Sequence, residues 1–120
     1  MIMKIIKDKR CVIGEGPIWN GFEKRLYFTN CFSNEICKLD IYTGELEVRK
    51  VDVGIAALAF TKDKRLVVSR YDGVFILNED DKIEELYDTS VIKIQLANDM
   101  KVGPDGRLYV GTQSSKRAGL

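Results

Sequence analysis

The chain has 120 residues, 45% hydrophobic and 31% charged, with a formal net charge of +1. These values are typical of a single soluble globular domain, and the neutral balance gives no reason to expect nucleic acid, an anionic membrane or an acidic partner. We find neither a membrane-spanning apolar run nor a signal peptide in the sequence, so we expect a cytoplasmic protein.

The chain contains three cysteines and no histidine. Cys11, Cys31 and Cys37 are odd in number and lack a Cys-x-x-Cys spacing, which argues against a disulfide framework or a structural zinc site and fits a reducing compartment. Without histidine, Ser-His-Asp and Cys-His nucleophilic sites are excluded. Chemistry is therefore expected to use carboxylates, amides and hydroxyls, with a hard oxygen-liganded cation as the favoured metal.

The elements alternate between short apolar runs and turns. Residues 1–11 are expected as an extended lead-in, and 14–17 as a turn around Glu15, because two glycines and a proline surround one acidic residue. Strands are predicted from period-two alternation, with a short helical turn at 88–96. The predicted strands comprise a first one starting at Ile18, which makes about four between Ile18 and Val53, and cover 26–30, 35–40, 45–51, 56–60, 66–69, 74–78, 83–87, 100–102 and 108–110.

One strand–turn–strand pattern occurs three times. Aligned on Arg-Leu, the copies begin at Arg25, Arg65 and Arg107, with spacings of 40 and 42 residues. In the third copy Gly106 is expected to take the positive φ that closes the hairpin. Short antiparallel strands recurring at this period indicate β-propeller blades, with units at about 12–53, 54–96 and 97–120. The alternative is a β-sandwich with hairpins that resemble each other by chance.

The blade count predicts an incomplete ring. A propeller needs at least four blades, whereas this all-β chain supplies about two and a half four-stranded blades. We expect a single incomplete domain that belongs to a longer protein or closes by self-association through its open sheet edges. A third interpretation is that the chain is a truncated gene product without a function of its own. The aromatic residues that alternate at strand spacing are expected to pack between blades: Trp19, Tyr27, Phe28, Phe60 and Phe75.

Four motifs resemble the senescence-marker-protein, gluconolactonase and luciferin-regenerating-enzyme family. They are GEGPIW at 14–19, RLYF at 25–28, DIYTG at 40–44 and NDMKVGPDGRLYVGT at 98–112. The resemblance implies the N-terminal part of a six-bladed propeller with one divalent cation in its central channel, most often calcium, with zinc or manganese as alternatives. The implied activity is hydrolysis of a carboxylic ester bond in a small sugar lactone.

The resemblance also assigns site residues. Glu15 matches a metal-ligating glutamate, and Asn98 matches an asparagine that contacts substrate; Asp99 is expected to support the loop. A carboxylate suits a hard cation, and an amide offers sugar hydroxyls both a donor and an acceptor. The general base is expected beyond the chain end, so the chain alone is expected to be inactive.

Three positions depart from the family pattern. Leu96 stands where many members have a substrate-binding arginine, and Lys116 lies near the position of a substrate-contacting glutamate. Asn30 replaces a common aspartate at a position expected to be structural. Because this arginine is replaced, the alternative hypothesis is a non-catalytic propeller that binds sugar or calcium or mediates an interaction.

Overall fold

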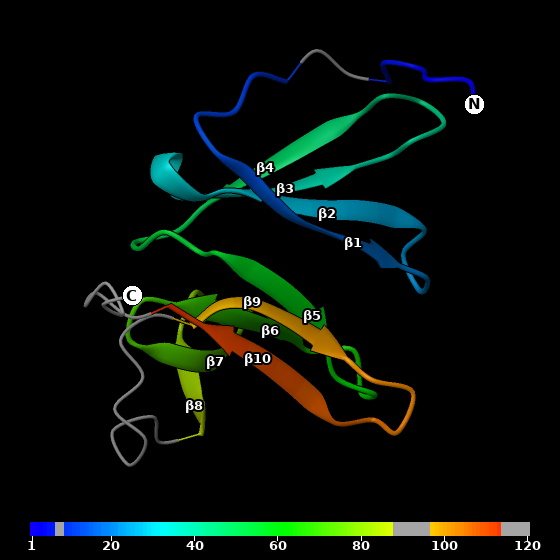
Figure 1. Cartoon of the computed structure of the whole chain (residues 1–120). Helices are drawn as coiled ribbons and strands as arrows, with labels where there is room; N and C mark the ends of the chain where they lie inside the picture. The colour runs from blue at the N-terminus through cyan, green and yellow to red at the C-terminus, as the bar shows by residue number, and fades with distance from the viewer. Residues whose placement is uncertain (7–8, 88–96, 114–120) are drawn as a thin grey trace, which may run out of the picture.

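The computed structural model describes residues 1–6, 9–87 and 97–113. Its strands form two four-stranded antiparallel sheets and one two-stranded sheet, each in sequence order (Figure 1). The first sheet contains β1 (Gly14–Asn20), β2 (Arg25–Asn30), β3 (Glu35–Leu39) and β4 (Leu46–Lys50); the second contains β5 (Ala57–Phe60), β6 (Leu66–Arg70), β7 (Gly73–Leu77) and β8 (Ile83–Tyr87); the third contains β9 (Ala97–Val102) and β10 (Leu108–Thr112).

The sheets follow one another as blades. Each begins with an inner strand, and β5 contacts β1 on one side and β9 on the other. The three inner strands therefore lie side by side, while later strands of each sheet extend outward (Figure 1). The chain is part of a β-propeller, and the all-β prediction is confirmed. The helical turn predicted at 88–96 lies outside the described residues.

Strands β5, β6 and β7 of the middle sheet are largely buried because they carry apolar side chains on both faces. On β7, Phe75 packs toward the first sheet in a cluster with Tyr27 and Leu58. Its neighbour Ile76 packs toward the third sheet with Met100. Successive side chains of a strand point to opposite faces, so the continuous apolar sequence of β7 supplies both interfaces.

The prediction that aromatic side chains pack between blades is confirmed for Tyr27, Phe60 and Phe75 and is wrong for Trp19. Tyr27, Phe60 and Phe75 all belong to the cluster between the first two sheets, and the Tyr27 and Phe60 rings meet edge-to-face with centroids 5.1 Å apart. Trp19 is 45% exposed, and Phe28 is half-buried outside this cluster. Strand alternation places a side chain on a face of the sheet but does not say whether another sheet covers that face.

The predicted turn at 14–17 is also corrected, because these residues lie within β1. Glu15 pairs with Thr29 and Ile18 with Tyr27, so Gly16 and Pro17 together oppose a single residue of β2. This is a β-bulge, and Gly16 has the positive φ of 59°. The glycines and the proline therefore bend the strand without ending it.

The tips of the three repeated hairpins share one conformation. The residue before each Arg-Leu pair has a positive φ: 54° at Lys24, 69° at Lys64 and 78° at Gly106. The prediction for Gly106 is confirmed, and lysine takes the same conformation in the first two copies. This common geometry explains why the repeat is detectable although its turn residues differ.

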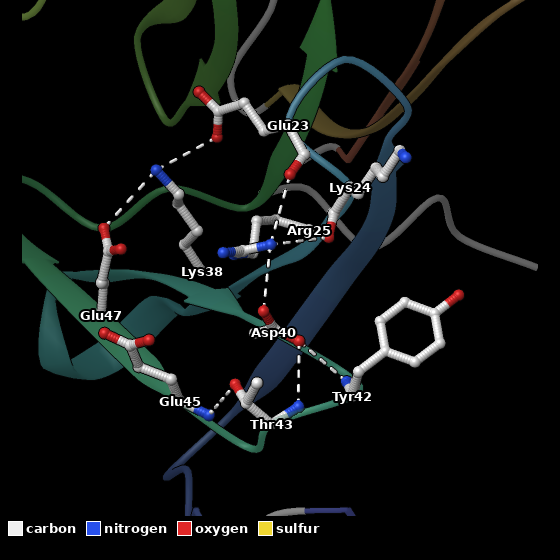
Figure 2. Close-up of polar contacts among 9 residues, drawn as sticks. All are labelled: Glu23, Lys24, Arg25, Lys38, Asp40, Tyr42, Thr43, Glu45 and Glu47. Carbon is white, nitrogen blue, oxygen red and sulfur yellow. Dashed lines mark hydrogen bonds and ion pairs between the residues drawn. The ribbon is translucent and has the colours of Figure 1, made fainter.

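At the same end of the first sheet as the β1–β2 hairpin tip, Asp40 holds the turn between β3 and β4 (Figure 2). Its carboxylate accepts hydrogen bonds from the backbone N–H groups of Tyr42 (2.8 Å) and Thr43 (3.0 Å), and it lies 3.1 Å from the Arg25 guanidinium. These bonds, that from Thr43 most strongly, lower the pKa of Asp40. The ion pair between Arg25 and Asp40 thus connects the β1–β2 turn to the β3–β4 turn.

All three cysteines are free thiols, and Cys37 is buried. No helix among the described residues has the length and apolar character needed to cross a bilayer.

Candidate functional site

A cavity of about 290 Å³ lies where the three inner strands meet. β1 and β9 supply its polar walls, and the start of β5 supplies a floor of small residues between them. Its lining comprises Glu15, Gly16, Pro17, Ile18, Ala56, Ala57, Leu58, Asn98, Asp99, Met100 and Lys101. The predicted site residues Glu15, Asn98 and Asp99 therefore come together in one cavity, although they are distant in sequence.

Glu15 reaches the cavity because β1 bends immediately after it. The bulge at Gly16 and Pro17 follows Glu15, and a bulge changes the direction of neighbouring side chains. The backbone is held in place by Thr29, a fully buried residue whose Oγ1 donates to the Glu15 carbonyl oxygen over 3.3 Å. Among the residues that the structure describes, none makes a hydrogen bond or ion pair with the Glu15 carboxylate.

Asn98 occupies a second bulge on the other inner strand. Asp99 pairs with Gly111 and Ala97 with Thr112, so Asn98 is the unpaired extra residue. Ala97 and Met100 on either side are buried against the middle sheet, whereas Asn98 is exposed. Its side-chain amide has no hydrogen-bond partner in the described parts of the chain and faces the cavity free to bind.

The remaining polar groups of the cavity are Asp99 and Lys101. The Asp99 Oδ1 accepts a hydrogen bond from the Met100 N–H over 2.8 Å. Lys101 is exposed on the same strand, and the sequence analysis missed it. Lysines are common on strand surfaces, so only the tertiary position distinguishes this one.

Glu15 also influences the thiol at the end of its hairpin. Burial raises the pKa of Cys31, and the negative charge of Glu15 raises it further. A raised pKa disfavours the reactive thiolate form of Cys31.

The cavity offers the types of ligand that a hard cation prefers, but too few of them to complete its coordination shell. Glu15 and Asp99 offer carboxylate oxygens and Asn98 an amide oxygen, the ligand types that calcium prefers. Calcium takes six to eight oxygens, and the described residues contain no group of three or more acidic, cysteine or histidine side chains in ligating geometry. These residues would therefore hold part of the coordination shell.

Of the three departures from the family pattern, only Asn30 lies within the described residues. It is buried at 3% exposure; its Oδ1 accepts from the Val12 N–H over 2.9 Å, and its Nδ2 donates to Glu35 over 2.9 Å. Asn30 is thus a structural residue of the first sheet, as expected. Leu96 and Lys116 lie outside the described residues.

Comparison with known proteins identifies the family. The family model described as SMP-30/Gluconolactonase/LRE-like region matches residues 13–119. The chain is 33% identical over 112 residues to the candidate sugar lactone lactonase YvrE of Bacillus subtilis, covering 89% of this chain and 37% of that protein. It is 30% identical over 120 residues to the pentonolactonase XacC of Haloferax volcanii, covering 99% of this chain and 40% of that protein.

The fold has solved counterparts. The calcium-binding protein regucalcin from Agrobacterium tumefaciens superposes with a TM-score of 0.74 at 21% identity, covering 89% of this chain and 37% of that one. The chain thus spans about two fifths of the length of these relatives. With the family model matching almost the whole sequence, the chain belongs to the SMP-30/gluconolactonase/LRE-like family and forms part of its propeller.

Proposed function

We propose that this chain contributes the first part of the active site of a divalent-metal-dependent sugar-lactone hydrolase. In this proposal Glu15 is a metal ligand, Asn98 binds the sugar and Asp99 fixes the strand that carries Asn98. Family membership supports lactone hydrolysis as the reaction class. The names of the relatives YvrE and XacC both refer to lactones, which supports the same class of small-molecule substrate.

One observation carries the proposal: Glu15 and Asn98 line the same cavity from two different blades, each with a polar side chain that has no hydrogen-bond or ion-pair partner among the described residues. Calcium is the proposed cation, because oxygen ligands suit it and a relative with the same fold is a calcium-binding protein.

The proposed roles follow from the chemistry of each group. A bound cation would supply electrostatic stabilisation of charge developing on the lactone carbonyl oxygen. Glu15 would hold it with negative charge, and the Asn98 amide would orient the sugar by donating to one hydroxyl and accepting from another. Lactone hydrolysis also needs a group that activates water, and we propose that this base comes from outside the chain.

Calcium binding to the chain tests the role of Glu15. By calorimetry, Glu15→Gln is expected to weaken calcium binding about tenfold or more, because an amide keeps the oxygen but loses the charge. The matched control is Glu45→Gln, which makes the same change at an exposed turn residue away from the cavity. Equal calcium affinity in all three proteins would remove Glu15 from the proposed metal site.

Activity tests whether the chain is sufficient. Gluconolactone hydrolysis, assayed with calcium, zinc and manganese, is expected to stay at background for this chain and to appear in a version extended to six blades. Robust metal-dependent turnover by the 120-residue chain would show that the base lies within it and would contradict this part of the proposal.

A non-catalytic sugar-binding propeller is the second candidate. It is favoured by the free amide of Asn98, since amide and carboxylate side chains bind sugar hydroxyls without any reaction. The six-blade version would then bind the sugar acid product, show no turnover with any of the three metals, and lose that binding in Asn98→Ala.

A further inference from the structure

We propose that Lys101 makes this cavity selective for sugar lactones and sugar acids that carry an anionic group at the end of the carbon chain remote from Asn98. The inference rests on the proposed function, because it assigns a substrate class to the same cavity. Three observations support it. Lys101 lines the cavity, its ammonium has no ion-pair partner among the described residues, and it lies three residues after Asn98 on β9.

Lys101 is the only cation among the described residues that line the cavity. It forms no ion pair or hydrogen bond with any other described side chain, although several lysines of the chain do. The Lys38 Nζ lies 3.1 Å from the Glu23 Oε2, and the Lys50 Nζ lies 2.8 Å from the Glu35 Oε1. An unpaired ammonium beside a cavity of free polar groups can bind an anion without first breaking an internal ion pair.

Spacing along β9 separates Lys101 from Asn98 by the length of a small ligand. A regular strand advances about 3.3 Å per residue, and Asn98 is the extra residue of a bulge, so the two Cα atoms lie at most roughly 10 Å apart. The flexible lysine stem shortens the gap between the functional groups. A six-carbon sugar acid in extended form can therefore reach the Asn98 amide with its hydroxyls and the Lys101 ammonium with a terminal acidic group.

Charge distribution fixes the orientation of such a ligand. Glu15 and Asp99 are carboxylates, so the part of the cavity near Asn98 repels an anion and accepts hydroxyl groups or a cation. Lys101 is the position where negative charge on the ligand is attracted. A lysine ammonium acts as a compact point charge, so a carboxylate and a phosphate satisfy the same requirement.

The test is a titration of the chain, by NMR chemical shifts at low ionic strength, with four probes of one carbon skeleton. Glucitol is neutral, gluconate has one carboxylate, glucarate has two, and 6-phosphogluconate adds a phosphate. Gluconate is expected to bind about tenfold more tightly than glucitol, the effect of one charge-assisted contact, whereas the second carboxylate of glucarate is expected to add little because Glu15 and Asp99 repel it. 6-Phosphogluconate carries both a carboxylate and a phosphate, so binding tighter than that of glucarate would identify phosphate as the preferred anionic group.

Variants assign the preference to Lys101. Lys101→Met is expected to reduce the preference to about twofold or less, and Lys101→Arg to retain it. The matched control is Lys62→Met at an exposed lysine of the β5–β6 turn, outside this cavity. Equal binding of glucitol and gluconate, a preference for the acid that survives Lys101→Met, or no binding of any acid would overturn the inference.

Measuring calcium binding and acid binding separately distinguishes failure of this inference from failure of the proposed function. A chain that binds calcium through Glu15 but does not distinguish gluconate from glucitol overturns only the role of Lys101. A chain that prefers gluconate to glucitol through Lys101 but binds no calcium overturns only the metal-dependent mechanism.

Discussion

Glu35 shows how one buried charge organises its surroundings. Its carboxylate accepts hydrogen bonds from Lys50 (2.8 Å), Asn30 (2.9 Å) and Lys9 (3.0 Å), and these contacts, that from Lys50 most strongly, lower its pKa to about 2. An aspartate at position 30, common in the family, would replace the donor with a second carboxylate. Asn30 is therefore suited to its neighbour Glu35, and the departure from the family pattern has a local cause.

This contact set predicts how stability depends on pH. Because the folded pKa of Glu35 lies below the ordinary value of 4.5, its stabilisation is complete above pH 4.5 and disappears as pH falls toward 2. Glu35→Gln is expected to cost about 1–2 kcal/mol at pH 7, and much less at pH 2.5. Urea unfolding at both pH values measures this difference. Glu45→Gln serves as the control, and an equal cost at both pH values would contradict the prediction.

Gly16 shows what a single bulge does for the strand β1. The backbone there has a φ of 59°, and a Cβ atom would lie 3.2 Å from both the Ala56 carbonyl oxygen and the Ala57 Cα. Glycine is therefore required twice, for its conformation and for the close approach of β1 to β5. The same bulge directs Glu15 into the cavity, so the geometry of the strand and of the candidate site are linked.

Gly16→Ala is expected to destabilise the chain by about 1–3 kcal/mol, through left-handed backbone strain and the tight contact with β5. Gly21→Ala is the matched control in the same hairpin, because its Cβ would meet nothing closer than Trp19 Nε1 at 4.0 Å. Thermal unfolding of both variants measures the difference. Equal melting temperatures would show that β1 and β5 separate more readily than the structure indicates.

At the scale of the whole molecule, the middle sheet connects the other two. Leu58 is buried in the cluster toward the first sheet and Ile76 in the cluster toward the third. Arg49 adds a polar link between blades, since its guanidinium lies 2.6 Å from Asp81. Because one sheet takes part in both clusters, the described blades are expected to unfold together.

Leu58→Ala and Ile76→Ala are each expected to cost about 2–5 kcal/mol, because both side chains are 2% exposed and their removal leaves a cavity. Each variant should lower the midpoint of a single unfolding transition, followed by circular dichroism and by Trp19 fluorescence. Tyr42→Ala, at an 81% exposed residue, should leave that midpoint unchanged. Two separate transitions, each sensitive to one variant, would show that the blades unfold independently.

Local sequence patterns predicted most of the fold. Alternation and turn residues placed the strands within a few residues of their observed bounds, and the repeated Arg-Leu hairpin predicted the blade period. These features depend on neighbours in sequence, so they can be read without coordinates. The same patterns failed at 14–17, where glycine and proline form a bulge within a strand, and at Trp19, whose face of the sheet is left uncovered.

The sequence by itself determined the strand pattern, its repeat and the residue types that are proposed to bind a cation and a sugar. Only the tertiary structure decided that Glu15, Asn98 and Lys101 line one cavity, because this depends on how inner strands of different blades approach each other. That approach is set by contacts between residues distant in sequence, such as Gly16 against Ala56, and periodicity along one strand carries no information about them.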